Sequence, residues 1–496
     1  MSILIRESIT QESAHAFRAD LERSGAGASV GGAAIATELQ MKGIALHGKD
    51  MLEEIGVSDE VGFLLQTPSP HEGYTPEGVE YATELFDLPT GADGKPLPYD
   101  KMIDAYLNRP EILARYRELL GKHDKIIDIA HFYVEAAVRG ALLEELAKEP
   151  GYENLAERVL QVTYFHSSPA LTIRAESPEY FQNSNTSWER RMYEIATLKT
   201  SIVAFSTRQE REITARAYDG VYGLTYEDIM KRSVVAPLPI NSEAFNVENP
   251  IEKRAEARQK LGLKQDATVL GMVTRIDTEK GYDVLIENFV QWLNDLKEQD
   301  TDISNIQLAV LGGVPLKDPR LMSRAQEMKQ YIASLPEDIQ SQIIFPGVAM
   351  SASEVMFAFD AYFGPSQTET LHLAPKEAGL CQVQSEIDGT TITHGIPAFL
   401  SKIAAHEETH PDDSAFFFDK DSYESHELKD DKTGEIVHVA GFKEAFEKAL
   451  SPKHRAYYGE RNHHNSQRFG LEQSTWTLLD EIDKNLKSQD SNFTLS

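Results

Sequence analysis

The sequence has 496 residues, a length that exceeds what one hydrophobic core supports and that predicts two or three domains. Its composition is that of a folded globular protein, with 41% hydrophobic and 26% charged residues. A formal net charge of -30 disfavours nucleic acid or an anionic membrane surface as the main partner. The single cysteine, Cys381, excludes an internal disulfide and any zinc or iron–sulfur site built on cysteines.

The sequence predicts neither a secretory signal nor a transmembrane helix. Its first residues, MSILIRESITQESAHAF, lack the long apolar stretch of a secretory signal. No run of about 18 apolar residues occurs, so we expect no transmembrane helix. Together with the single thiol, these features predict a cytoplasmic protein.

The first half of the chain mixes helices with short apolar strands. A loosely recognisable strand, SILIRES, is followed by an amphipathic helix over 10–23 and by a glycine-rich loop that opens a helix over 33–42. Further strands are predicted at 61–68, 125–130, 158–166 and from 233. Helices are predicted at 101–121, with a break at Pro110, and at 135–148. A strand, a turn and a helix are predicted over 200–213.

The second half alternates strands and helices more regularly. It opens with a charged helix that ends at a glycine, over 248–266, a pattern typical of a linker between domains. Strands are then predicted at 267–275, 305–313, 341–349 and 360–366, and helices at 281–298, 319–335, 351–359 and from 374. Such alternation indicates parallel sheets that helices cover on both faces. Right-handed crossovers make each half a doubly wound, Rossmann-like α/β domain that binds ligands beyond the carboxyl ends of its strands, so two such domains would face each other across a cleft.

Two cations follow the first strand of the second half. Arg275 comes directly after that strand, and Lys280 follows five residues later, just before a glycine and a helix. An arginine fork and a lysine ammonium at the mouth of a parallel sheet can neutralise a diphosphate. The alternative is an ordinary solvated loop with incidental charges.

Two glutamates eight positions apart follow a later strand of the same half. Glu369 and Glu377 bracket the start of a predicted helix, with Pro375 in its first turn. The helix N-terminus favours a phosphate, and carboxylates accept hydrogen bonds from sugar and ribose hydroxyls. The alternative for Glu377 is a carboxylate that merely complements the helix dipole.

The first half carries weaker signals. The loop GAGASVGG superficially resembles a nicotinamide-dinucleotide fingerprint, but its spacing differs, and Gly31 and Gly32 are better suited to close approach of a ligand to the backbone. His131 and His166 each end a predicted strand, and a lone histidine in such a place is usually structural. Adjacent histidines at 463 and 464 point to different faces of a helix, so we expect no metal site there.

Several segments match the ordered motifs of one enzyme family. VLGMVTRIDTEKGYDVLIENF is similar to GRL-x-x-x-KG-x-x-x-LI-x-A, and FGPSQTETLHLAPKEAGL is similar to PS-x-x-E-x-FGL-x-x-x-EA. In the first half DIAHFYVEAAVRGALL, VTYFHSSPALTIR and IVAFSTRQEREITARAYDG also have counterparts, and FGLEQSTWTLLDEIDKNL is similar to a closing helix. Over residues 125–490 the chain thus resembles the retaining GT-B glycosyltransferases of family 4, above all the branch of sucrose and sucrose-phosphate synthases.

The resemblance implies an architecture and a set of roles. It implies a GT-B fold with an acceptor-side domain over 1–245, a nucleotide-sugar domain over 246–455, and a segment over 456–496 whose helix returns to the first domain. It implies that Arg275 and Lys280 bind the donor diphosphate. It further places Glu369 and His166 beside the donor sugar, Glu377 on the ribose, other donor contacts at Gly271, Leu371, His372 and Leu373, and acceptor-side positions at Gly31, Gly32, His131 and Glu135.

Some motif positions depart from the family. His372 replaces a glycine that lets the donor approach the backbone, CQVQSEIDGTTITH lengthens the segment before GIPAF, and a lysine expected at the acceptor site is absent, with Arg174 only nearby.

The resemblance predicts a hexosyltransferase that moves glucose or another hexose from a nucleotide sugar such as UDP-glucose to a small-molecule or glycan acceptor, with retention and without a metal or other cofactor. One alternative is a sucrose-phosphate synthase-like enzyme. The other is a GT-B protein that binds a nucleotide sugar as a partner or regulatory subunit and has lost transfer.

Overall fold

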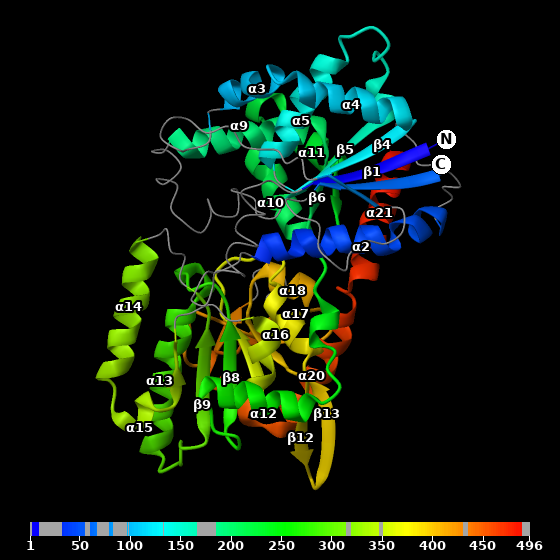
Figure 1. The fold of residues 1–496 in the computed structure, drawn as a ribbon. Helices are drawn as coiled ribbons and strands as arrows, with labels where there is room; N and C mark the ends of the chain where they lie inside the picture. Colours follow the sequence, from blue (N-terminus) through cyan, green and yellow to red (C-terminus); the bar gives the residue numbers. More distant parts are fainter. Residues whose placement is uncertain are drawn as a thin grey trace. The chain divides into compact units, whose positions relative to one another are not determined.

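The computed structural model describes residues 2–8, 32–54, 60–66, 79–82, 97, 99–131, 133–165, 185–313, 319–346, 351–429 and 435–488 (Figure 1). The predicted helix over 10–23 and most of the glycine-rich loop lie outside these residues. The chain forms two compact units, and it passes from one to the other at Pro239–Ile240 and again at Gly470–Leu471.

The first unit contains a parallel sheet, as the alternation of strands and helices predicts. Its strands run in the order β3-β2-β1-β4-β5-β6-β7. Their bounds are β1 Ser2–Ser8, β2 Glu60–Gln66, β3 Val79–Ala82, β4 Lys125–Ala130, β5 Val159–Phe165, β6 Ile202–Phe205 and β7 Ser233–Val235. The predicted strand SILIRES is therefore confirmed as β1, with β2 and β4 as its neighbours.

Helices of the first unit pack around this sheet. They are α2 Gly32–Glu54, α3 Tyr99–Leu107, α4 Pro110–Lys122, α5 Tyr133–Leu146, α6 Leu155–Arg158, α9 Asn185–Thr200, α10 Arg208–Tyr218, α11 Tyr226–Lys231 and α21 Leu471–Ser488. Pro110 occupies the first turn of α4, where its missing N–H costs nothing, and so separates α3 from α4. The closing helix α21 packs on α2, and the indole N–H of Trp476 lies 3.3 Å from Glu54.

The second unit contains another parallel sheet, with strand order β10-β9-β8-β11-β14-β15. The strands are β8 Thr268–Val273, β9 Ile306–Leu311, β10 Ile343–Ile344, β11 Ala361–Gly364, β14 Ala398–Ser401 and β15 Phe416–Phe418. Successive strands run outward from β8 to β10, and then the order reverses at β11. The carboxyl ends of β8 and β11 thus mark the topological switch point at which doubly wound sheets bind ligands.

Helices cover both faces of this second sheet. Leu270 and Met272 of β8 pack with α13, whereas Val269, one residue before Leu270, packs with α12 on the other face. The helices are α12 Pro250–Leu261, α13 Tyr282–Glu298, α14 Pro319–Ser334, α15 Glu337–Gln340, α16 Ala352–Val355, α17 Leu373–Leu380, α18 Ala404–Thr409, α19 Phe442–Leu450 and α20 Pro452–Gln467, with 3-10 turns at Ser242–Phe245, Thr278–Lys280 and Met356–Ala358.

The charged helix α12 is fixed to the second sheet. Arg254 and Arg258 donate to the two carboxylate oxygens of Asp360 at 2.6 and 2.7 Å. The same carboxylate accepts the backbone N–H of Val269 at 2.8 Å. The linker pattern of this segment therefore reflects a helix whose cations anchor it to the sheet.

Two β-hairpins are additions that the sequence interpretation missed. The stretch that lengthens the segment before GIPAF forms β12 Gln382–Ile387 and β13 Thr390–Gly395. Asp388 and Gly389 have φ values of 51° and 78°, which is the left-handed pair that a tight hairpin turn requires. The second hairpin joins β16 His426–Lys429 to β17 Ile436–Val439.

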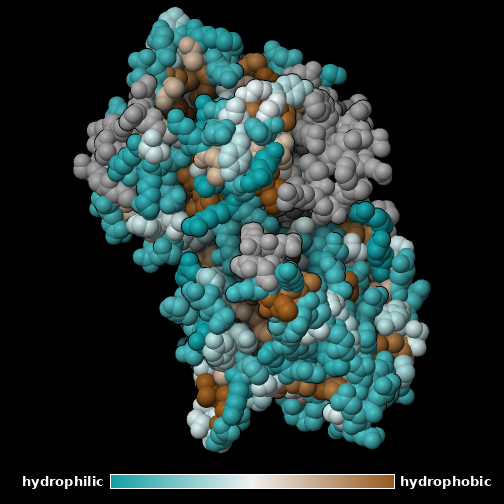
Figure 2. Space-filling view, turned by 180° about the vertical axis from the view of Figure 1, so that it is seen from behind, coloured by the Kyte–Doolittle hydropathy of each residue, from teal (hydrophilic) through white to brown (hydrophobic). Residues whose placement is uncertain are grey.

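The face drawn in Figure 2 is mainly hydrophilic. Figure 2 shows one face on which hydrophobic residues gather only in small groups, in keeping with the high net charge. Among the described helices, none combines the length and the apolar character that crossing a membrane requires.

Gly281 should be among the most sensitive glycines of the second unit. It has φ 72°, and a Cβ atom there would lie 2.3 Å from the carbonyl oxygen of Pro365, just past β11. Gly262 has nearly the same φ, 70°, but open space around it. We expect Gly281→Ala to lower the free energy of unfolding by about 2 to 3 kcal/mol and Gly262→Ala by about 1 kcal/mol, as measured by denaturant titration.

Candidate functional site

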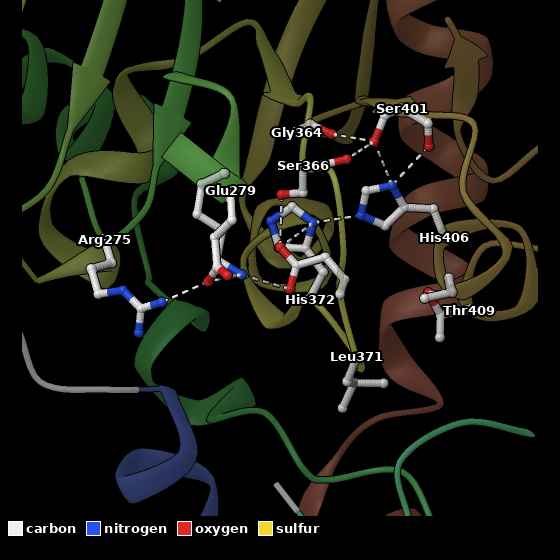
Figure 3. Close-up of polar contacts among 12 residues, drawn as sticks. Arg275, Glu279, Gly364, Ser366, Leu371, His372, Ser401, His406 and Thr409 are labelled. Atoms are coloured by element: carbon white, nitrogen blue, oxygen red, sulfur yellow. Dashed lines mark hydrogen bonds and ion pairs between the residues drawn. The ribbon is translucent and has the colours of Figure 1, made fainter. Parts of the chain in front are cut away.

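The loops that follow β8 and β11 carry the predicted donor residues. The strands are neighbours in the sheet, so their carboxyl ends lie side by side. Arg275 and Lys280 follow β8, and the segment from Ser366 to Glu377 follows β11 (Figure 3). The structure therefore brings together Arg275, Lys280, Glu369 and His372 at the switch point of one sheet, as the sequence predicts for a ligand site.

Carboxylates of the same loops hold both cations. The guanidinium of Arg275, whose side chain is 41% exposed, lies 3.2 Å from Asp277 and 2.7 Å from Glu279. The ammonium of Lys280 lies 3.0 Å from Oε2 of Glu369 and 3.7 Å from Glu279. Gly281 then turns the chain into α13 with its left-handed φ. The two cations thus sit on a short, constrained loop.

Glu369 is ionised and buried. Its Oε1 accepts a hydrogen bond of 2.7 Å from the hydroxyl of Ser366. Burial by itself raises the pKa of Glu369, but the electrostatic influence of His372 and Lys280 outweighs burial and lowers this pKa below its usual range. Lys280 and Glu369 therefore form an ion pair at neutral pH.

His372 adopts a conformation that favours glycine. It precedes the first residue of α17 and has φ 53° and ψ 83°. A side chain in this region costs about 1 kcal/mol, which neighbouring contacts must offset. The buried ammonium of Lys376 supplies two such contacts, 2.8 Å to the carbonyl oxygen of Leu371 and 3.2 Å to that of His372. Burial lowers the pKa of Lys376 to about 7.

His406 belongs to this site, and the sequence interpretation missed it. It lies in α18, and its Nε2 is 2.8 Å from Nδ1 of His372, with the two rings stacked (Figure 3). Its Nδ1 lies 2.8 Å from the carbonyl oxygen of Ser401 at the end of β14. Burial lowers the pKa of His406 to about 4 and that of His372 well below its usual value. Both imidazoles are therefore neutral near pH 7.

Glu377 lies in the middle of α17 and is half-buried. Burial raises the pKa of its carboxyl to about 7. Glu377 and Glu369 therefore differ: one titrates near neutral pH, and the other stays ionised.

The remaining predicted donor residues have mixed surroundings. Leu371 is buried, and Leu373 is the first residue of α17. Gly271 lies inside β8, and a Cβ atom there would meet the ring of Phe359 at 2.1 Å. Close packing against Phe359 thus accounts for this glycine.

Three of the predicted acceptor-side residues, Gly32, His131 and Glu135, belong to the first unit. His131, at the end of β4, is buried and stacks on Tyr164 at 5.3 Å, and burial lowers its pKa to about 3. Glu135 pairs with the buried Arg139 at 2.5 Å, and Arg139 also pairs with Asp128. Gly32 is the first residue of α2, while Gly31 and His166 lie outside the described residues.

The buried charges of this region balance. Arg6 of β1 lies 3.4 Å from Asp128, and the hydroxyl of Tyr116 lies 2.8 Å from the same carboxylate. Arg6 and Arg139 thus face Asp128 and Glu135, and the four formal charges cancel.

Sequence comparisons give no family: no protein-family model and no curated protein sequence matches the chain. Solved structures do match it over nearly the whole chain. Sucrose-phosphate synthase from Thermosynechococcus elongatus has 16% identity and a TM-score of 0.58, with 98% of this chain and 99% of that chain covered. HepE from Anabaena in complex with UDP-glucose has 15% identity and a TM-score of 0.57, with 98% and 100% covered.

A third similar structure is an α,α-trehalose-phosphate synthase (UDP-forming) from Burkholderia vietnamiensis, with 13% identity and a TM-score of 0.58 over 97% of this chain and 99% of that chain. At such identities the likeness concerns the fold. It agrees with the two parallel sheets and with the return of the closing helix α21 to the first unit. The chain therefore has the GT-B fold of these glycosyltransferases.

Proposed function

We propose that the chain is a retaining hexosyltransferase of the family 4 type that transfers glucose from UDP-glucose to an acceptor hydroxyl. The observation that carries this proposal is the placement of Lys280, Glu369 and the start of α17 at the switch point between β8 and β11. Structural neighbours solved with UDP-glucose or UDP support the choice of donor.

The chemistry follows from these groups. Breaking the bond between sugar and diphosphate leaves negative charge on the leaving group. Arg275, Lys280 and the N-terminus of α17 would stabilise that charge in the transition state. Glu369 would accept hydrogen bonds from the sugar hydroxyls, and Glu377 from the ribose hydroxyls. The acceptor hydroxyl would attack on the face from which the diphosphate departs, so that the anomeric configuration is retained without a protein nucleophile. Catalysis then rests on positioning, and we expect no need for a metal.

The direct test is incubation of the full chain with UDP-glucose and a panel of acceptors that includes fructose 6-phosphate, glucose 6-phosphate and unphosphorylated sugars. We expect UDP release that depends on one acceptor and an α-linked product, as read by NMR of the anomeric proton. A β-linked product would overturn the retaining mechanism.

A second function is favoured by His372. Its imidazole stands where the family resemblance expects a glycine that admits the donor, and it is held by Tyr362 and His406. This arrangement supports a protein that binds a nucleotide sugar and serves as a partner or regulatory subunit. UDP-glucose binding by calorimetry, without UDP release in the presence of any acceptor, would select this function over transfer.

The raised pKa of Glu377 predicts that donor binding depends on pH. Ribose hydroxyls donate best to an ionised carboxylate, so binding requires Glu377, with a pKa of about 7, to lose its proton. UDP-glucose itself does not titrate between pH 6 and 8. As the pH rises from 6 to 8, we expect the dissociation constant of UDP-glucose to fall about tenfold more in wild type than in Glu377→Gln. Lys376 titrates in both proteins, so the difference between the two calorimetric profiles isolates Glu377.

The unliganded protein provides the control. The folded pKa of Glu377 lies above its unfolded value, so its contribution to stability is complete below about pH 4.5 and is lost as the pH rises through about 7. Glu377→Gln should therefore be about 2 kcal/mol more stable relative to wild type at pH 8 than at pH 5. Identical pH profiles of unfolding would contradict the raised pKa.

A further inference from the structure

Three side chains past the ends of β11 and β14 bring one possible ligand atom each close together. These atoms of Glu369, His372 and His406 all lie within 4.8 Å of one another. Nδ1 of His372 is 2.8 Å from Nε2 of His406 and 3.6 Å from Oε1 of Glu369. His406 is fully buried, and the side chains of His372 and Glu369 are only 7% and 8% exposed.

Neighbouring groups fix the tautomer of His406. Its Nδ1 lies 2.8 Å from the carbonyl oxygen of Ser401, which can only accept a hydrogen bond. Nδ1 therefore carries the proton, and Nε2 presents a lone pair toward His372. A histidine that donates one N–H to a backbone carbonyl and presents its other nitrogen is the usual arrangement of a metal ligand.

The hydroxyl of Tyr362 decides the tautomer of His372. It lies 3.1 Å from Nε2 of His372 and 3.3 Å from the carbonyl oxygen of Val273. If it donates to His372, then Nδ1 of His372 carries the proton and donates to His406. If the hydroxyl donates to the carbonyl oxygen of Val273, Nε2 of His372 carries the proton and donates to the hydroxyl oxygen. Lone pairs of Nδ1 of His372, Nε2 of His406 and Oε1 of Glu369 then face one another. That second arrangement requires a cation between the three side chains.

Ligand type indicates which cation. Two imidazoles and one carboxylate are typical ligands of zinc and related transition metals. Calcium and magnesium prefer sets made only of oxygen atoms.

We propose that Glu369, His372 and His406 bind one divalent transition-metal ion of the zinc class, with a fourth position for water. Only Oε1 of Glu369 is needed, so Oε2 keeps its contact with Lys280. The switch of His372 from one neutral tautomer to the other makes room for the ion without a change in net protonation. The ion would occupy Oε1 of Glu369, a carboxylate that the proposed function assigns to the donor sugar, so the ion and the sugar would compete for this residue; metal binding is measured without donor, so the two proposals fail separately.

The test measures metal directly. The full chain, stripped with a chelator and dialysed against limiting Zn2+, is expected to retain one equivalent by mass spectrometry of the metal. Co2+ in place of Zn2+ should give visible absorption bands of a four- or five-coordinate site. Wild-type protein that retains no stoichiometric metal would overturn the proposal.

Two ligand variants and one matched control assign the site. His406→Gln and Glu369→Gln should each weaken Zn2+ binding by at least about tenfold and abolish the Co2+ bands. His394→Gln is the control, because His394 is a buried histidine of the same unit that bonds Ser385 and the carbonyl oxygen of Gly395. It should bind Zn2+ as wild type does. Thermal melts show whether each variant folds. If His406→Gln does not fold, the result for Glu369→Gln decides the assignment. Wild-type binding by Glu369→Gln would place the metal elsewhere.

Discussion

Arg275→Ala is expected to lower kcat/KM for glucosyl transfer by about 100- to 1000-fold, the usual cost of removing one preorganised donor to a developing charge. Within the part of the chain that the structure describes, the ion pairs of the guanidinium stay on its own loop. It is 41% exposed, and its two partners, Asp277 and Glu279, lie on its own loop. Loss of such exposed pairs changes stability by at most about 1 kcal/mol. The measurement is UDP release from UDP-glucose with the acceptor found for wild type.

A matched control separates this effect from general loss of positive charge. Arg461 lies on α20 of the same unit, where its guanidinium contacts the carbonyl oxygen and the ring of Tyr457. Arg461→Ala should keep wild-type kinetics. If Arg275→Ala turned over at the wild-type rate, Arg275 would not contact the diphosphate. Of the two cations proposed to bind the diphosphate, Lys280 would then remain.

The periodic strands and helices of the second half were predictable from the sequence. The predicted strand over 267–275 is β8, and the predicted helix over 281–298 is α13. These elements are buried on both faces or on one stripe, so their hydrophobic pattern reflects their packing. The hairpin of β12 and β13 was also open to prediction, because Asp388-Gly389 is flanked by alternating residues.

The candidate site was predictable only where its residues follow strands. Arg275, Lys280 and Glu369 each sit in a loop after a strand of one parallel sheet, so topology brings them together. His406 gives no such signal, because it lies 34 residues beyond His372 and reaches it only through the pairing of β11 with β14. Nor does the sequence show that Lys376 turns inward to hold the carbonyl groups of 371 and 372.

The ion pair of Lys280 and Glu369 predicts that stability and transfer can be separated. Lys280→Met should lower the free energy of unfolding by about 2 to 3 kcal/mol, because it leaves the carboxylate of Glu369, 8% exposed, without its ammonium partner. The same change should lower kcat/KM by about 100- to 1000-fold through loss of a diphosphate contact. Denaturant titration and UDP release measure the two effects.

The double variant Lys280→Met/Glu369→Gln distinguishes the two roles. A neutral amide needs no counter-charge and still accepts the hydrogen bond from Ser366, so most of the lost stability should return. Transfer should not return, because the diphosphate would still lack the cation that stabilises its departure. If both stability and transfer recovered in the double variant, Lys280 would serve only to neutralise Glu369. The charge on the leaving group would then have to be stabilised by Arg275 and the N-terminus of α17 alone.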